Sequence, residues 1–271
     1  MEPISLFRLG KYSLDWVKDF YTQSDIWWGP DAGENYYKGR VATIEHICGK
    51  EPKRILELGA GSGAVAAILA EAGHAVVAVE LTEAILPMRE RNEARWKGSL
   101  TALHADFYTV ILDGQFDVVC YWDGFGIGSD ADQYRLLRRV AREWLAPAGS
   151  VLIDVFNPIR YARHASEEEI LPPLKGVPGS VEMRHRCHFD PVQCRWIDEW
   201  EPTAEPDKVL AQTVRCYTPA DFALLLKGSG LKLKSIEIDG VELDFNSNGI
   251  TLSGPLMEAY SYLAQLIPDG R

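Results

Sequence analysis

The chain has 271 residues, of which 46% are hydrophobic and 25% charged, a composition typical of a globular protein with a sizeable core. Its formal net charge is -11, because 39 aspartates and glutamates outnumber 28 lysines and arginines, and such a surface repels a phosphate backbone. We therefore expect no nucleic-acid partner and favour a small molecule or a peptide.

The sequence predicts neither a secretion signal nor a membrane segment. Its first residues, MEPISLFRLGKY, lack a basic start followed by an apolar core, and no apolar stretch approaches the ~20 residues that a membrane span needs. We expect a cytoplasmic protein without membrane contact. Paired C-x-x-C motifs are absent, so we expect reduced thiols and no bound metal from the five cysteines, Cys48, Cys120, Cys187, Cys194 and Cys216.

The N-terminal segment is rich in aromatic side chains, and from Arg54 the pattern changes to short apolar runs separated by helix-like stretches. Runs that are apolar on both faces predict a parallel sheet covered by helices on both sides. The predicted strands are RILELGAG, HAVVAVEL, SLTALHAD, FDVVCYWD and SVLIDVFN. The predicted helices span residues 63–72, 82–96 and 130–145. Pro147 and Gly149 are expected to end the third helix.

After Pro158 the sequence becomes rich in proline and glycine, and three strand-like stretches follow. Asp190 and Pro191 supply a turn between the first two, so we predict an antiparallel meander inserted into the α/β domain. Thr218 and Pro219 then begin a helix, and two strands, LKLKSIEID and AYSYLAQLI, complete the sheet. The predicted division of the chain is 1–53, 54–158, 159–216 and 217–271.

A glycine-rich loop, ELGAGSG at residues 57–63, follows the first strand and opens a helix. Its glycines let the backbone turn sharply and approach a ligand closely, so a nucleoside-type cofactor is expected there. Glu80 ends the second strand, where an acidic side chain accepts hydrogen bonds from a ribose diol. Gly59, Gly61 and Ala64 also satisfy the dinucleotide fingerprint, so the loop alone leaves NAD as an alternative.

The wider pattern resembles the class I S-adenosylmethionine-dependent methyltransferases. ELGAGSG is similar to motif I of that family, and the later motifs follow in order as VVAVELT, HADF, FDVVCYWDGFG and REWLAPAGSVLIDVFN. Dinucleotide binders rarely carry an acid such as Glu57 inside the glycine strand. The resemblance covers residues 54–157 and departs from the family at Ala148, which replaces the first glycine of a P-G-G turn.

This resemblance implies an α/β fold with a Rossmann-like, seven-stranded, mostly parallel sheet, helices on both faces and an antiparallel last strand. Related enzymes use an aromatic N-terminal segment as a helical lid, which here would be residues 1–53. The implied cofactor is S-adenosyl-L-methionine. Its implied ligands are Tyr37, Arg40, Glu57, Gly59, Ala60, Gly61, Glu80, Leu81, Asp106, Phe107, Tyr121 and Trp122.

The resemblance also implies a role for the main members of this set. Glu80 would hold the ribose hydroxyls, and Asp106 would accept a hydrogen bond from the adenine amino group. Leu81 and Phe107 would flank the adenine ring. The alternative for Asp106 is a solvated acid in a loop.

The methionine portion of the cofactor would lie against the glycine loop. Glu57 would support the loop or contact the cofactor's amino group through water, and Arg40 would bind its carboxylate. Tyr121 and Trp122 would close that side from the fourth strand, although Trp122 fits equally well as a core aromatic.

The acceptor is expected between the N-terminal segment and the meander. The candidate substrate-binding residues are Tyr21, Trp28, Asn157 and Arg184, and the candidate catalytic bases are His185 and His188. Alternation along one strand places the two histidines on opposite faces, so only one of them can point inward. The alternatives are that the aromatics pack the N-terminal helices, that Arg184 pairs across the meander, and that the histidines are surface or packing residues.

We predict an S-adenosylmethionine-dependent methyltransferase that transfers a methyl group to nitrogen or oxygen of a small-molecule metabolite by in-line displacement. No D/N-P-P-Y motif follows the fourth strand, which argues against methylation of adenine or of glutamine amides in nucleic acid or protein. The alternatives are an NAD-dependent oxidoreductase and a non-catalytic S-adenosylmethionine-binding protein. A homodimer is compatible with the sequence, which does not determine the oligomeric state.

Overall fold

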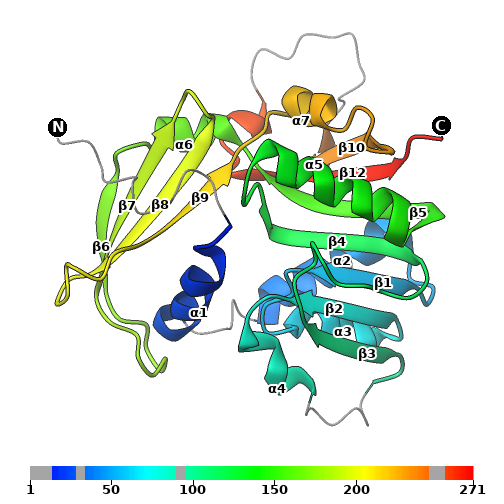
Figure 1. The fold of residues 1–271 in the computed structure, drawn as a ribbon, viewed down its shortest axis with the longest axis horizontal. Coiled ribbons are helices and arrows are strands. Elements are labelled where there is room, and N and C mark those ends of the chain that lie inside the picture. The colour runs from blue at the N-terminus through cyan, green and yellow to red at the C-terminus, as the bar shows by residue number, and fades with distance from the viewer. Residues whose placement is uncertain (1–13, 29–33, 90–95, 244–253, 271) are drawn as a thin grey trace.

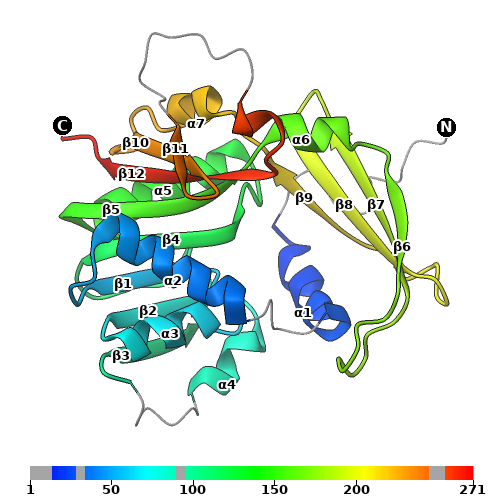
Figure 2. The same cartoon turned by 180° about the vertical axis from the view of Figure 1, so that it is seen from behind.

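The computed structural model describes residues 14–28, 34–89, 96–243 and 254–270. Two sheets dominate this structure, and helix α1 (Val17–Trp28) lies between them (Figures 1 and 2). None of the helices in these residues is both long enough and apolar enough to cross a membrane.

The larger sheet has the order β11-β10-β12-β5-β4-β1-β2-β3. Strands β1 to β5 pair in parallel, whereas β12 is antiparallel to both of its neighbours, which confirms the predicted Rossmann-like sheet with an antiparallel last strand. The predicted number of strands was wrong by one, because the chain turns at Asp239 and Gly240 and adds β11 to the edge. The strands are β1 Arg54–Leu58, β2 Ala75–Glu80, β3 Ser99–His104, β4 Phe116–Phe125, β5 Leu145–Phe156, β10 Leu231–Ile238, β11 Val241–Leu243 and β12 Ser261–Pro268.

Helices cover both faces of this sheet. Helices α2 (Glu34–Cys48) and α3 (Ala64–Ala72) lie on one face, and α5 (Asp130–Arg139) and α7 (Pro219–Leu225) lie on the other (Figures 1 and 2). Neighbouring residues of β1 therefore enter different cores: Ile55 packs with α2 and α3, while Leu56 packs with α5. This double burial explains why the central strands are apolar on both faces.

The helix predicted over residues 82–96 lies only partly within the described residues. A 3-10 turn at Glu83–Ile85 precedes α4 (Leu86–Arg89), and residues 90–95 lie outside the described part of the chain. Pro87 lies in the first turn of α4, where its missing N–H costs no helical hydrogen bond.

The end of the third predicted helix also differs from the prediction. Helix α5 continues through a π-helical turn (Val140–Trp144), and Leu145 already belongs to β5. Pro147 and Gly149 therefore lie within the strand and do not end the helix. The register between β4 and β5 is irregular at this point, where a strand tolerates proline.

The predicted meander is a separate antiparallel sheet with the order β6-β7-β8-β9. Helix α6 (Pro158–Arg163) leads into it, and a 3-10 turn (Pro255–Met257) precedes β12. Strand β6 was not predicted, because its Glu168 and Glu169 are exposed and its apolar residues do not alternate. Its strands are β6 Glu168–Leu171, β7 Met183–Asp190, β8 Arg195–Pro202 and β9 Leu210–Arg215.

Candidate functional site

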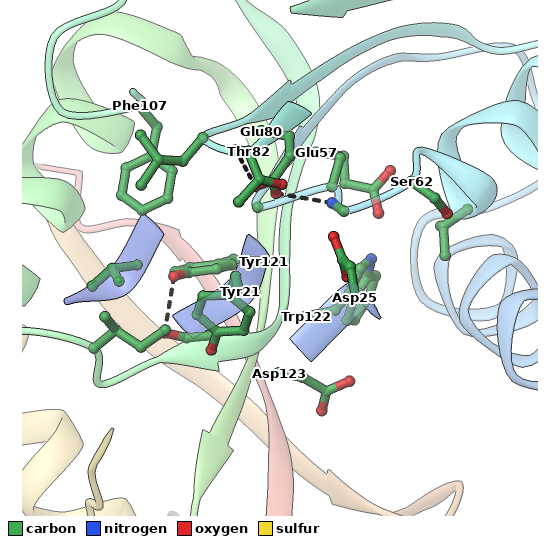
Figure 3. A pocket seen from close by; sticks show the side chains of 18 of the residues that line it. Tyr21, Asp25, Glu57, Ser62, Glu80, Thr82, Phe107, Tyr121, Trp122 and Asp123 are labelled. Carbon is green, nitrogen blue, oxygen red and sulfur yellow. Dashed lines mark hydrogen bonds between the residues drawn. The ribbon is translucent and has the colours of Figure 1, made fainter. Parts of the chain in front are cut away.

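A cavity of about 500 Å³ lies at the carboxyl ends of β1, β2 and β4, with α1 on its other side. A volume of this size is typical of small-molecule and cofactor sites. The ends of the strands contribute the glycine loop, Glu57 and Glu80, whereas α1 contributes Tyr21 and Asp25 (Figure 3). The side chains used below are Tyr21, Asp25, Tyr36, Tyr37, Glu57, Glu80, Thr82, Asp106, Phe107, Tyr108, Tyr121, Trp122 and Asp123.

The glycine loop can take its shape only because it lacks side chains at three positions. Gly59, Gly61 and Gly63 have φ values of +61°, +53° and +76°. A Cβ added at Gly59 would lie 3.0 Å from the Tyr121 ring, and one added at Gly63 would lie 2.8 Å from Ile85 Cδ1. Because these positions lack side chains, the loop backbone can pack closely, and Gly59 and Gly61 line the cavity.

Glu80 links the loop to the end of β2. Its Oε2 accepts a hydrogen bond from the Gly61 N–H at 2.9 Å, and its Oε1 accepts one from the Thr82 N–H at 2.7 Å. The side chain lines the cavity while remaining only 8% exposed. A carboxylate fixed in this way is placed to accept hydrogen bonds from hydroxyl groups of a ligand.

Glu57 lies in the floor of the cavity and is 2% exposed. Its Oε2 has no hydrogen-bond partner among the described residues. Burial and the nearby charge of Glu80 raise the pKa of this carboxyl to about 8, although a backbone hydrogen bond from Ala66 acts in the opposite direction. A buried polar atom without a partner is costly, so this oxygen fits a polar ligand or a water held by one.

Aromatic side chains form the wall at the end of β3 and β4. Phe107 meets Tyr121 edge to face with ring centroids 5.5 Å apart, and Tyr121 donates a hydrogen bond to the Gly124 carbonyl at 2.9 Å. Asp106 Oδ1 accepts a hydrogen bond from the Tyr108 N–H at 2.7 Å. The wall offers flat apolar surface beside one carboxylate, which suits an aromatic base with an amino group.

Helix α1 brings Tyr21 to the cavity and joins it to the smaller sheet. The Tyr21 hydroxyl donates to Gln212 Oε1 at 3.1 Å, and Gln212 Nε2 donates to Asp198 Oδ2 at 2.8 Å. Asp198 also binds His185 Nε2 at 2.5 Å. His185, predicted as a base, does not line the cavity, and Asp198 and Gln212 connect it to Tyr21.

Trp28, predicted to contact the acceptor, packs against the same sheet. Its ring lies 4.5 Å from that of Trp200, which stacks on His185 at 4.0 Å between ring centroids. Trp28 is not part of the cavity lining.

Three further predicted residues make contacts within the protein and do not line the cavity. Asn157 is fully buried, caps α6 through the Ile159 N–H and donates to the carbonyls of Leu256 and Ala259. On the other face of β7, Arg184 pairs with Glu201 at 3.0 Å and His188 contacts Glu199 at 3.2 Å. The predicted alternation along β7 is thus observed, while none of these three side chains lines the cavity.

Arg40 also lies just beyond the lining. Its guanidinium pairs with Asp154 at 2.5 Å and stacks on the rings of Tyr36 and Trp122, each 4.8 Å from the guanidinium carbon. It therefore braces α2 against the ends of β4 and β5. A direct contact between Arg40 and a ligand carboxylate stays a prediction.

The other predicted residues all line the cavity. They are Tyr21, Tyr37, Glu57, Gly59, Ala60, Gly61, Glu80, Leu81, Asp106, Phe107, Tyr121 and Trp122. Sequence reasoning missed Asp25 and Asp123. Asp25 follows Tyr21 by four residues and so shares its helix face, and Asp123 is a non-glycine residue with φ +52° at the end of β4.

Part of the larger sheet matches a known protein family. Residues 55–149 match the family model of a methyltransferase domain. Cypemycin N-terminal methyltransferase from a Streptomyces species is 32% identical over 127 residues, which are 46% of this chain and 51% of that relative. The match thus spans about half the length of the curated relative.

Solved structures share the fold over nearly the whole chain. The CcbJ methyltransferase from Streptomyces caelestis superposes with a TM-score of 0.64 at 20% identity, covering 94% of this chain and 96% of that one. The glycopeptide N-methyltransferase MtfA gives a TM-score of 0.54 at 18% identity, covering 92% and 97%.

Proposed function

We propose that the chain is a class I S-adenosylmethionine-dependent methyltransferase and that it methylates a nitrogen or oxygen of a small-molecule acceptor. The observation that carries this proposal is the glycine loop tied to Glu80 at the carboxyl ends of β1 and β2. A ligand of an open parallel sheet binds at these strand ends.

The residues of the cavity fit this cofactor. Glu80 offers a fixed carboxylate for the ribose hydroxyls, and Asp106 lies beside Phe107 where the adenine ring would bind. The orphaned Oε2 of Glu57 fits a donor from the methionine portion, directly or through water. When bound, S-adenosylmethionine supplies a methyl group on a positively charged sulfur.

The chain's own contribution is positioning and the exclusion of water. Methyl transfer by in-line displacement needs the acceptor atom aligned behind the methyl group, and little covalent chemistry is left for the protein. Tyr21 from α1 and Trp122 from β4 both line the cavity, and their aromatic faces attract a cation. Removing water strengthens that attraction.

Nitrogen is the better supported acceptor atom. The cypemycin enzyme is named an N-terminal methyltransferase, and MtfA is named a glycopeptide N-methyltransferase. No histidine lines the cavity within the described residues. A hydroxyl acceptor needs a base to remove its proton during transfer, whereas a neutral amine already carries a lone pair.

The test is a methyl-transfer assay with matched pairs of small amines and alcohols. We expect an amine to gain the mass of one CH₂ for each S-adenosylhomocysteine formed, and Glu80→Ala to lose this activity. Methylation of alcohols alone would contradict the nitrogen assignment. Cofactor binding without product from any acceptor would identify a non-catalytic binding protein.

A further inference from the structure

Five carboxylates line the cavity, and most of them have hydrogen-bond partners within the protein. Both oxygens of Glu80 accept backbone hydrogen bonds, and Asp106 accepts one from the Tyr108 N–H. Asp123 receives a hydrogen bond from the Tyr36 hydroxyl and lies 3.5 Å from Arg40. Asp25 and the Oε2 of Glu57 remain, and neither has a hydrogen-bond or ion-pair partner among the described residues.

Asp25 lies on α1, one turn after Tyr21, and its carboxylate points into the cavity (Figure 3). Burial and the charge of Glu80 raise the pKa of Asp25 to about 6, so the group is still ionised at neutral pH. A partly desolvated carboxylate without a partner is unfavourable, and a cationic ligand would relieve it.

Glu57 supplies the second, independent observation. It is 2% exposed, it lines the same cavity as Asp25 (Figure 3), and its Oε2 has no partner in the described structure. With its pKa raised to about 8 by burial, Glu57 is mainly neutral at pH 7 and contributes little charge. Asp25 is therefore the ionised group available to a cation beside the glycine loop.

The only other charged side chain that α1 sends to this cavity is Lys18. It lies seven residues before Asp25, which is two helical turns, or about 10 Å along the axis. The same cavity is also lined by Tyr36, Tyr37 and Trp122. Aromatic rings beside a carboxylate are the surroundings that an ammonium group prefers.

We propose that Asp25 of α1 binds the α-ammonium group of S-adenosylmethionine, so that α1 is held over the cavity by the cofactor itself. This inference rests on the proposed function. It adds a positioning residue from outside the large sheet to the cofactor site. It also gives the N-terminal helix a direct reason to lie against the cavity when the cofactor is present.

The test is isothermal titration of the full chain with two ligands, S-adenosylhomocysteine and 5′-methylthioadenosine. Both carry adenosine and a thioether, and only the first has the ammonium group. We expect Asp25→Asn to weaken S-adenosylhomocysteine binding ~10-fold or more, as for a lost charge-assisted hydrogen bond, and to leave 5′-methylthioadenosine binding unchanged. Asp25→Glu should retain part of the affinity.

Asp19→Asn is the matched control, because Asp19 is an exposed aspartate on the same helix outside the lining, and it should change neither affinity. Unchanged S-adenosylhomocysteine binding in Asp25→Asn would overturn the proposal. Equal weakening of both ligands would also overturn it, since it would indicate a disturbed helix. Failure of the wild-type chain to bind S-adenosylhomocysteine would overturn the proposed function, and this inference with it.

Discussion

Single residues with unusual surroundings mark the site. Gly63 begins α3 with a left-handed backbone, and Asp123 adopts φ +52° although it has a side chain. Glu57 is a buried carboxyl with one oxygen unpaired. The backbone of Asp123 and the unpaired oxygen of Glu57 are unfavourable for folding alone, and such features concentrate where a protein binds a ligand.

Gly63→Ala should destabilise the fold. Its added Cβ would lie 2.8 Å from Ile85 Cδ1 and 3.2 Å from Met88 Cγ, on a backbone with φ +76°. We expect a loss of about 1–3 kcal/mol in the free energy of unfolding, measured by chemical denaturation. Gly39→Ala is the control, because Gly39 lies in α2 with open space around it and should become slightly more stable. A neutral Gly63→Ala would contradict the described loop.

Glu57 should make stability fall as the pH rises. Its folded pKa, about 8, exceeds its ordinary value, so the folded state binds the proton more tightly and is favoured at low pH. That stabilisation is complete below the ordinary pKa and is lost as the pH approaches 8. Relative to Glu57→Gln, which does not titrate, the wild type should lose on the order of 2 kcal/mol between about pH 5 and about pH 7. Parallel stability profiles for the two proteins would contradict this account.

At the scale of elements, α1 connects the two sheets. Tyr21 reaches the cavity from this helix and binds Gln212 of β9, while Trp28 packs against Trp200 of β8. The smaller sheet thus acts on the site through α1 and supplies no side chain of its own to the cavity within the described residues. We therefore expect ligand binding to depend on the docking of α1.

Trp28→Ala tests this docking. The variant loses the edge-to-face contact with Trp200, and we expect faster amide hydrogen exchange over residues 17–28 and ~10-fold weaker S-adenosylhomocysteine binding. Ile26→Ala serves as the control, because Ile26 is 50% exposed on the same helix. If Trp28→Ala exchanged and bound like the control, α1 would not depend on the smaller sheet.

At the scale of the whole molecule, the sequence predicted those parts of the fold and of the site that depend on local patterns of residues. The apolar runs gave the parallel sheet, and the motif order placed Glu80, Phe107 and Tyr121 around one cavity. These residues lie at or near the ends of strands, so the pairing of the strands determines their positions.

The other features of the site depend on contacts between segments that are distant in the sequence. The pairing of Arg40 with Asp154 of β5 was not predicted, because it needs α2 to pack across the sheet. His185 was predicted as a base but lies behind Gln212 and Asp198. Asp25 was missed because its place in the cavity depends on how α1 docks, which no local pattern records.

Calorimetric titration with S-adenosylhomocysteine and NAD tests the central claim most directly, for the wild type and for Glu80→Ala. We predict that S-adenosylhomocysteine binds the wild type with one site per chain, that Glu80→Ala weakens it at least tenfold, and that NAD does not bind. Binding of NAD without S-adenosylhomocysteine would contradict the assignment and return the glycine loop to its dinucleotide alternative.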